Sequence, residues 1–236
     1  MYKYMTERVA IRRFDPSQII PHSTIVIVGR RRTGKSFLVR DILFHCRHIS
    51  QGWVFNGTEH LNHFYSTFVP KNNVFQPYSS DTLQAILEAQ TVKINKLGST
   101  NPASWAFVVL DDCMTAAEFK HDTLVKVFCE GRHYNLMVII AMQYVLGLPP
   151  TCRLNADYTF VMREMATETR RKIHSNFGCS AGTFEDFQSI MNACTNDNEC
   201  LVINTIPNKS SMIEDNVFFY KAHDVTPNYL EATKDR

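Results

Sequence analysis

Short runs of apolar residues alternate along the chain with segments whose apolar positions have helical spacing. Residues 25–28 read Ile-Val-Ile-Val and residues 136–142 are apolar throughout, a pattern typical of parallel strands buried on both faces. We predict strands at 9–14, 25–28, 53–56, 106–110, 136–142, 158–162, 201–204 and 217–220, and helices at 36–47, 82–96, 119–130 and 167–176. This alternation predicts an α/β fold, with a mostly parallel sheet and helices on both faces.

The length and composition of the chain fit one folded domain. Its 236 residues are enough for a single sizeable core, so we expect one domain over residues 1–236, with an N-terminal extension at 1–22 and a C-terminal tail at 223–236. The 25 basic and 23 acidic residues nearly balance. Net charge therefore gives no general attraction to a polyanion, although a local basic patch could still bind one.

Cysteine usage and hydropathy indicate where the protein works. The seven cysteines are scattered and none forms a CxxC pair, so we expect a reducing compartment and no disulfide framework. Residues 1–14 lack the apolar stretch of a signal peptide. The longest apolar run, near 136–142, is too short to span a bilayer. These features predict an intracellular, soluble protein with no membrane-spanning segment.

Residues 29–36 read Gly-Arg-Arg-Arg-Thr-Gly-Lys-Ser and match the phosphate-binding (Walker A) loop, G-x4-G-K-[ST]. Glycines let several backbone N–H groups converge on phosphate oxygens, and the following helix points its positive end at the same anion. In this pattern Lys35 reaches the β- and γ-phosphates of ATP, and the Ser36 hydroxyl binds Mg²⁺. The candidate nucleotide-binding residues are Gly29, Arg30, Arg31, Arg32, Thr33, Gly34, Lys35, Ser36 and Phe37.

The context of this loop favours phosphate binding over chance. A predicted buried strand ends at Val28 and a predicted helix begins at Ser36, whereas a glycine-rich turn with an incidental lysine would need neither. The arginines at the variable positions 30–32 could contact phosphate or a neighbouring subunit. Solvated surface charge explains them about equally well.

Two acids, Asp111 and Asp112, follow the apolar run 106–110. This is the Walker B arrangement, in which Asp111 holds Mg²⁺ through water and Asp112 polarises the attacking water. We expect this role to place strand 106–110 beside strand 25–28. Two acids at a strand end could instead form a turn or a helix cap, but the phosphate-binding loop upstream favours the catalytic interpretation.

Gln143 closes the apolar run 136–142. An amide at the end of a buried strand could hydrogen-bond both the γ-phosphate and the lytic water, although a lone glutamine after a strand is usually a solvated loop residue. Gln143 is a candidate because of the strand that it ends. Loop, acid pair and polar strand end together favour ATP hydrolysis over simple nucleotide storage.

These motifs and their surroundings resemble the genome-packaging ATPases of large DNA viruses, the poxvirus-type (nucleocytoplasmic large DNA virus) branch of the FtsK–HerA superfamily. The resemblance covers about residues 14–222 and is carried by residues 29–36, 54–59, 107–112, 131–135, 143, 149–150, 153–158 and 219–222. It implies a RecA-like P-loop NTPase core of the additional-strand (ASCE) type, with ATP and Mg²⁺ as cofactors. It also implies a motor that translocates double-stranded DNA into a capsid as a homo-oligomeric ring.

The resemblance further implies an arginine finger, a residue that completes the catalytic site of a neighbouring subunit. Arg132 matches the family position ahead of the strand that ends in Gln143, and Arg153 and Arg163 are competing candidates. Many superfamily members have glutamate where this chain has Asp112. The shorter side chain of Asp112 sets its carboxylate back by about one C–C bond.

Partners and location follow from the same resemblance. Capsid or portal-vertex proteins become candidate partners, and the virus assembly site in the host cytoplasm, or the virion, becomes the expected location. Lys93, Lys96 and Lys120 are candidate contacts to backbone phosphates, or else solvated surface charges. Two other functions use such a loop: a small-molecule or nucleotide kinase, and a nucleotide-gated assembly protein.

Histidines and cysteines after the phosphate-binding loop raise the question of a metal site. His45, Cys46 and His48 lie close together, with His60 and His63 further along. Their spacing matches no zinc pattern, so we predict no structural zinc among them.

Overall fold

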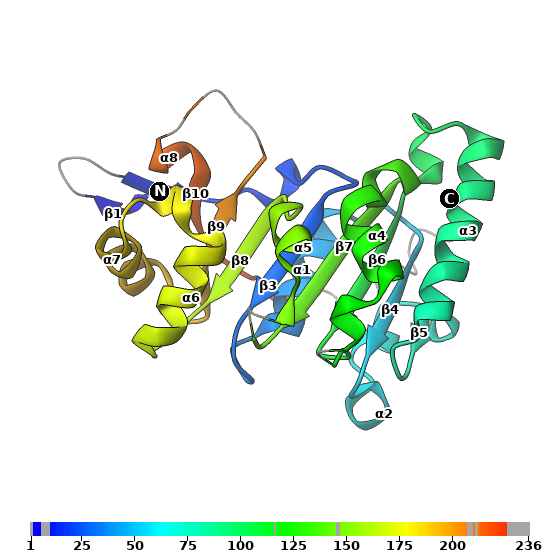
Figure 1. The fold of residues 1–236 in the computed structure, drawn as a ribbon, viewed down its shortest axis with the longest axis horizontal. Coiled ribbons are helices and arrows are strands. Elements are labelled where there is room, and N and C mark those ends of the chain that lie inside the picture. The colour runs from blue at the N-terminus through cyan, green and yellow to red at the C-terminus, as the bar shows by residue number, and fades with distance from the viewer. Residues whose placement is uncertain are drawn as a thin grey trace.

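The computed structural model describes residues 2–5, 10–115, 117–144, 147–206, 210 and 212–225, with only the backbone for residues 2–5 and Cys179. Strands in these ranges form one sheet in the order β1-β2-β10-β9-β8-β3-β7-β6-β4-β5 (Figure 1). The strands are β1 (Tyr2–Met5), β2 (Ala10–Arg13), β3 (Thr24–Val28), β4 (Gly52–Asn56), β5 (Val74–Phe75), β6 (Ala106–Asp111), β7 (Leu136–Met142), β8 (Tyr158–Met162), β9 (Glu199–Asn204) and β10 (Val217–Lys221).

The strands from β8 to β5 are all parallel, whereas β9 pairs antiparallel with both β8 and β10. At the far side β2 runs parallel to β10, and β1 runs antiparallel to β2. The predicted mostly parallel α/β sheet is confirmed.

Helices cover both faces of the sheet, but unequally. Figure 1 shows α3, α4, α5 and α6 in front of the sheet and α1 behind it. The helices are α1 (Lys35–His45), α2 (Glu59–Asn62), α3 (Ser80–Leu97), α4 (Asp122–Glu130), α5 (Pro150–Leu154), α6 (Thr167–Phe177), α7 (Phe184–Cys194) and α8 (Ile213–Asn216).

Alternating residues of the central strands supply both cores. In β3, Val26 and Val28 pack into the cluster that also contains apolar residues of α3, α4, α6 and α7. The intervening Ile25 and Ile27 pack into the second cluster, with apolar residues of α1. Because side chains of a strand point alternately to the two faces, an unbroken apolar run is what such a doubly covered strand requires.

The predicted elements are present with ends shifted by a few residues. Residue 9 of the first predicted strand lies outside the described residues, and the predicted helix 119–130 is a 3-10 turn, Glu118–Lys120, followed by α4. The helix α7 was not predicted. It begins with a capping box, in which the side chains of Thr183 and Asp186 each bond the other residue's backbone N–H. Most of the tail 223–236 lies outside the described residues.

The expected position of the acid-bearing strand is wrong. Strand β6, which ends in Asp111, does not lie beside β3, because β7 is inserted between them and pairs with both. All three strands are parallel, so their carboxyl ends still meet at one edge of the sheet. The strand in between ends next to Gln143, which therefore lies between the phosphate-binding loop and the acid pair.

In the described part of the chain, no helix combines the length and hydropathy needed to cross a bilayer. The cysteines with described side chains are free thiols.

Candidate active site

The phosphate-binding loop connects β3 to α1, and its two glycines are required by close packing and by backbone conformation. A Cβ on Gly29 would lie 2.6 Å from the Cβ of Met162, which is closer than carbon atoms can approach. Gly34 has φ +89°, in the left-handed region that favours glycine. The N–H of Gly29 donates to the carbonyl of Met142 at 3.1 Å, which ties the loop to the end of β7.

Lys35 stands at the start of α1 with its ammonium group turned into the site. The residue is buried, with 6% of its surface exposed. Its Nζ donates to the carbonyl oxygen of Arg30 at 3.2 Å and lies 3.2 Å from Oδ2 of Asp112. This buried ammonium contacts oxygen atoms, an environment in which it can also bind the oxygens of an anion.

Ser36 and Asp111 meet across the site. The Ser36 hydroxyl donates to Oδ2 of Asp111 at 2.6 Å, and the Tyr65 hydroxyl donates to the same oxygen at 2.8 Å. Asp111 is 3% exposed, and its Oδ1 is buried without a hydrogen-bond partner among the described residues. Burial raises the pKa of Asp111, while the hydrogen bonds from Ser36 and Tyr65 oppose that rise.

The residues present fit a magnesium ion. A hydroxyl oxygen and a carboxylate oxygen are the hard ligands that Mg²⁺ prefers, directly or through its waters. The unpartnered Oδ1 of Asp111 is a buried acceptor that a cation, or a water bound to it, would satisfy.

Tyr65 is a site residue that the sequence analysis missed. It lies in the 3-10 turn Tyr65–Thr67, after β4, and is completely buried. The carboxylate of Glu59 holds this turn by accepting the N–H of Tyr65 at 3.0 Å and that of Ser66 at 2.8 Å. Glu59 itself is buried and lies 3.5 Å from Nδ2 of Asn56, the last residue of β4. The segment 54–59 thus positions the hydroxyl that contacts Asp111.

Replacing Tyr65 by phenylalanine is expected to weaken Mg²⁺ binding and change little else. Loss of a hydrogen bond to a charged carboxylate costs about 1.5 kcal/mol, so the Mg²⁺ concentration for half-maximal ATPase activity should rise about tenfold, with kcat at saturating Mg²⁺ nearly unchanged. A Mg²⁺ titration of phosphate release measures both. Tyr78→Phe is the matched control, because the Tyr78 hydroxyl is also buried but has no hydrogen-bond partner in the described part of the chain. Equal Mg²⁺ dependence of the two variants would refute the role of Tyr65.

Asp112 and Gln143 complete the edge of the site. Gln143 Nε2 donates to Oδ2 of Asp112 at 3.2 Å, on the oxygen that also faces Lys35. The Asp112 backbone has φ +45°, an uncommon conformation for a residue other than glycine, and its N–H donates to the carbonyl of Ala141. The Asp112 side chain is 32% exposed, so it can reach a water molecule.

The arginines of the loop differ in their surroundings. Arg30 donates through Nε to the buried carboxylate of Glu164 at 2.9 Å, just beyond the end of β8. Arg31 and Arg32 are exposed. The Thr33 hydroxyl donates to the Arg30 carbonyl at 2.8 Å.

A cavity of about 320 Å³ adjoins the loop on the side of β9 and β10. It is lined by Arg32, Gly34, Phe37, Leu38, Met162, Asn198, Cys200, Lys221 and Ala222. Phe37 therefore lines this cavity beside the phosphate-binding loop.

Arg132 lies away from these residues. It belongs to the 3-10 helix Gly131–Tyr134, which precedes β7, so the length of that strand, roughly 20 Å, separates it from the edge with the phosphate-binding loop. It lines a cavity with His22 and Asp157, near the amino ends of the strands. Arg132 cannot contact the phosphate site of its own chain.

The competing arginines are engaged within the chain. Arg153 donates to the carbonyl of Leu148. Arg163 follows β8 and donates to the Thr195 carbonyl at 3.2 Å and to the Asn196 side chain. Among the candidate DNA contacts, Lys93 bonds the Gln51 side chain from α3, whereas Lys96 and Lys120 are exposed.

A phosphate-binding loop after a central strand, an acid pair two strands away and a polar residue just after the strand between them define a P-loop ATPase. Residues 12–219 match the model of the family described as Poxvirus A32 protein, and the chain belongs to that family.

Known relatives come from large DNA viruses. An uncharacterized protein of Acanthamoeba polyphaga mimivirus is 30% identical over 224 residues, which cover 91% of this chain and 78% of that protein. An uncharacterized protein of Frog virus 3 is 33% identical over 228 residues, which cover 92% of this chain and 70% of the relative.

A solved structure shares the fold. The genome packaging NTPase B204 of Sulfolobus turreted icosahedral virus 2, in complex with AMPPCP, has a TM-score of 0.60 and 18% identity. The likeness covers 87% of this chain and all of that one, 100%.

Proposed function

We propose that this chain is a viral genome-packaging ATPase that uses ATP hydrolysis to move double-stranded DNA. The observation that carries the proposal is the convergence of Lys35, Ser36, Asp111, Asp112 and Gln143 at one edge of the sheet, linked by the contacts described above. Membership of the poxvirus A32 family and the fold shared with a genome packaging NTPase support the packaging role.

In the proposed mechanism, Ser36 and Asp111 would hold Mg²⁺, which when bound neutralises charge on the β- and γ-phosphate oxygens. The loop N–H groups and Lys35 bind the phosphates. When the Lys35 ammonium turns to them it leaves Oδ2 of Asp112, 3.2 Å away, and the carboxylate becomes free to orient and deprotonate a water. Gln143, hydrogen-bonded to the same carboxylate, is placed to sense the γ-phosphate.

The edge position of Arg132 bears on how the ATPase assembles. Because Arg132 lies at the amino ends of the strands, it can serve as an arginine finger only for another subunit. A ring in which one subunit's amino edge faces the next subunit's phosphate-binding loop would bring them together. Hydrolysis would then require the assembled ring, since the finger stabilises the transition state from outside the chain.

Mixed rings test this arrangement. Arg132→Ala subunits and Lys35→Ala subunits should each be nearly inactive alone. Mixing them should restore part of the ATPase activity, because some interfaces combine an intact phosphate-binding loop with an intact Arg132. The control variant is Arg171→Ala, which removes an arginine of α6 instead of Arg132. Subunits with this change should be active without mixing. Full activity of Arg132→Ala alone, or no recovery at any ratio, would rule out this finger.

Displacement of a third DNA strand tests translocation. A ring that moves along duplex DNA should strip a triplex-forming oligonucleotide from its path when ATP is present. The Lys35→Ala protein should leave the triplex intact. Rapid ATP hydrolysis by the wild-type protein with no displacement on any duplex would contradict the motor and leave only an ATPase. In the proposed role, capsid or portal-vertex proteins receive the DNA.

A further inference from the structure

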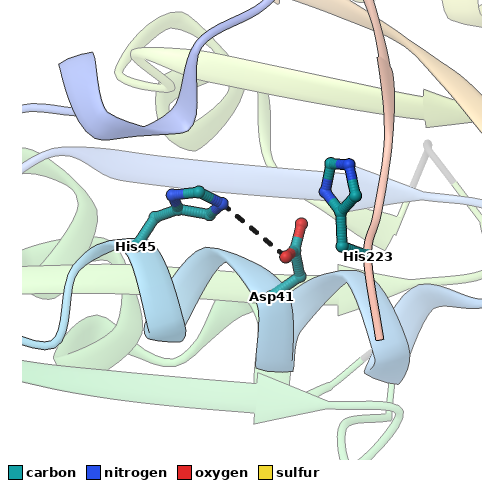
Figure 2. A group of neighbouring side chains, drawn as sticks. All are labelled: Asp41, His45 and His223. Carbon is teal, nitrogen blue, oxygen red and sulfur yellow. Dashed lines mark ion pairs between the residues drawn. The ribbon is translucent and has the colours of Figure 1, made fainter. Parts of the chain in front are cut away.

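Three metal-ligating side chains gather at the far end of α1 from the phosphate-binding loop. Asp41 and His45 lie one helical turn apart on α1, and His223 follows β10. Figure 2 shows the Asp41 carboxylate between the two imidazole rings. His45 and His223 line a cavity of about 270 Å³ together with Arg13, Phe14, Asp15, Pro16 and Tyr220. From Lys35 to His45 the helix rises about 15 Å, so this cluster is separate from the ATPase site.

The carboxylate of Asp41 is buried, and its contacts include the Tyr220 hydroxyl and the backbone N–H of His223. The residue is 0% exposed. Its Oδ2 accepts a hydrogen bond from the Tyr220 hydroxyl at 2.5 Å, while Oδ1 has no hydrogen-bond partner among the described residues. Nε2 of His45 lies 3.7 Å from Oδ1, which is too long for a hydrogen bond. Burying a carboxylate oxygen without a donor is costly, and a cation bound at Oδ1 would offset that cost.

We propose that Asp41, His45 and His223 form a binding site for a divalent transition-metal ion, best suited to Zn²⁺. Two imidazoles and one carboxylate are a ligand set that zinc uses, with a water molecule in the fourth tetrahedral position. The three ligand atoms already lie within 4.8 Å of one another. A tetrahedral zinc ion needs them about 3.3 Å apart. The 3.7 Å between His45 Nε2 and Asp41 Oδ1 is close to this value, and both histidines lie partly at the surface, where they can rotate.

The contact between Arg13 and His223 competes with metal binding, and this competition can be tested. Its Nη2 lies 2.8 Å from Nε2 of His223, while Nδ1 of His223 faces the Tyr220 hydroxyl at 3.4 Å on the Asp41 side. If His223 binds the metal through Nδ1, its ring proton is on Nε2. Nε2–H and the guanidinium of Arg13 are then both donors, so the guanidinium has to move away. Arg13 is exposed and can turn into solvent. Metal binding and the contact between Arg13 and His223 are therefore mutually exclusive.

A metal here would join the helix of the phosphate-binding loop to the segment after β10. Asp41 and His45 belong to the last turns of α1, and His223 lies about 180 residues further along the chain, so the ion closes a long loop. Such a cross-link fixes α1 against the sheet and should raise the unfolding temperature. The proposal does not depend on the ATPase function.

The proposal is tested by titrating zinc into the nucleotide-free full chain and following binding by calorimetry. Excess Mg²⁺ is present to occupy sites built from oxygen ligands. We expect one ion per chain, and at least about tenfold weaker binding for His45→Ala and for His223→Ala. His48→Ala is the matched control, because His48 is an exposed histidine near α1 whose ring meets Trp105 edge to face. This variant should bind zinc like the wild type. Arg13→Gln should bind zinc more tightly than the wild type.

Cobalt spectroscopy separates this site from adventitious binding by cysteines. Co²⁺ bound by Asp41, His45 and His223 should give the visible bands of a tetrahedral ion without the near-ultraviolet charge-transfer band of a thiolate ligand. Zinc should raise the unfolding temperature of the wild type and of His48→Ala, but not of His45→Ala. A thiolate band, equal zinc affinity of His45→Ala and the wild type, or no stoichiometric binding would each overturn the proposal. In the last case the cluster is an ion-pair network only.

Discussion

Replacing Asp112 by asparagine is expected to lower the kcat of ATP hydrolysis by about 10²- to 10⁴-fold, the usual contribution of a general base. The amide keeps the size of the side chain and can still accept a hydrogen bond from Gln143, but it cannot take a proton from water. ATP affinity should stay within a few-fold of the wild type, because the phosphate contacts come from the loop and Lys35. The variant should therefore bind ATP and fail to hydrolyse it.

Single-turnover phosphate release and equilibrium binding of a fluorescent ATP analogue separate the two effects. Asp81→Asn, which removes an exposed carboxylate in the first turn of α3, is the control and should hydrolyse ATP at the wild-type rate. If Asp112→Asn retained a third or more of the wild-type rate, the base would have to be another residue.

Replacing Lys35 by alanine is expected to reduce both ATP binding and hydrolysis. The ammonium is buried and lies among oxygen atoms, so its interaction with phosphate is little screened by water. Loss of one preorganised donor lowers kcat by about 10²- to 10³-fold, and loss of its ground-state contact should weaken ATP binding as well. The change also removes the cation beside Asp112, which is partly exposed, so solvent compensates and the fold should be retained.

Steady-state kinetics with a binding titration distinguish this result from that of Asp112→Asn. Lys35→Ala should change both kcat and ATP affinity, whereas Asp112→Asn should change kcat alone. Lys96→Ala, an exposed lysine of α3, is the control. Unchanged ATP affinity in Lys35→Ala would mean that the buried ammonium acts only as the partner of Asp112.

Local patterns in the sequence were sufficient to predict the central strands and the residues at their ends. The phosphate-binding loop, Asp111, Asp112 and Gln143 each follow a continuous apolar run, and a buried parallel strand leaves little choice about where its polar residues begin. The order of the strands was not predictable in this way. The insertion of β7 between β3 and β6 depends on how whole layers pack. The residues of a strand do not indicate which other strand will pair with it.

Residues that act through distant contacts were also missed. Tyr65 lies in a short turn, and only the folded chain brings its hydroxyl to Asp111, 46 positions away. The pairing of Arg30, a predicted loop residue, with Glu164 was not predictable for the same reason, because 134 positions separate them. The helix α7 could have been predicted, because Thr183 and Asp186 form a capping-box pattern ahead of apolar residues at helical spacing. No spacing rule links Asp41 and His45 to His223.

The most direct test of the central claim is the rate of phosphate release from ATP, measured with and without duplex DNA on protein whose assembled mass is determined in parallel. A DNA-translocating ATPase should form an oligomer and hydrolyse ATP several-fold faster with duplex DNA, and Lys35→Ala should show no stimulation. An ATPase rate that duplex DNA does not change in the assembled protein would contradict the account. So would transfer of the γ-phosphate to a nucleoside monophosphate, which would make the protein a kinase.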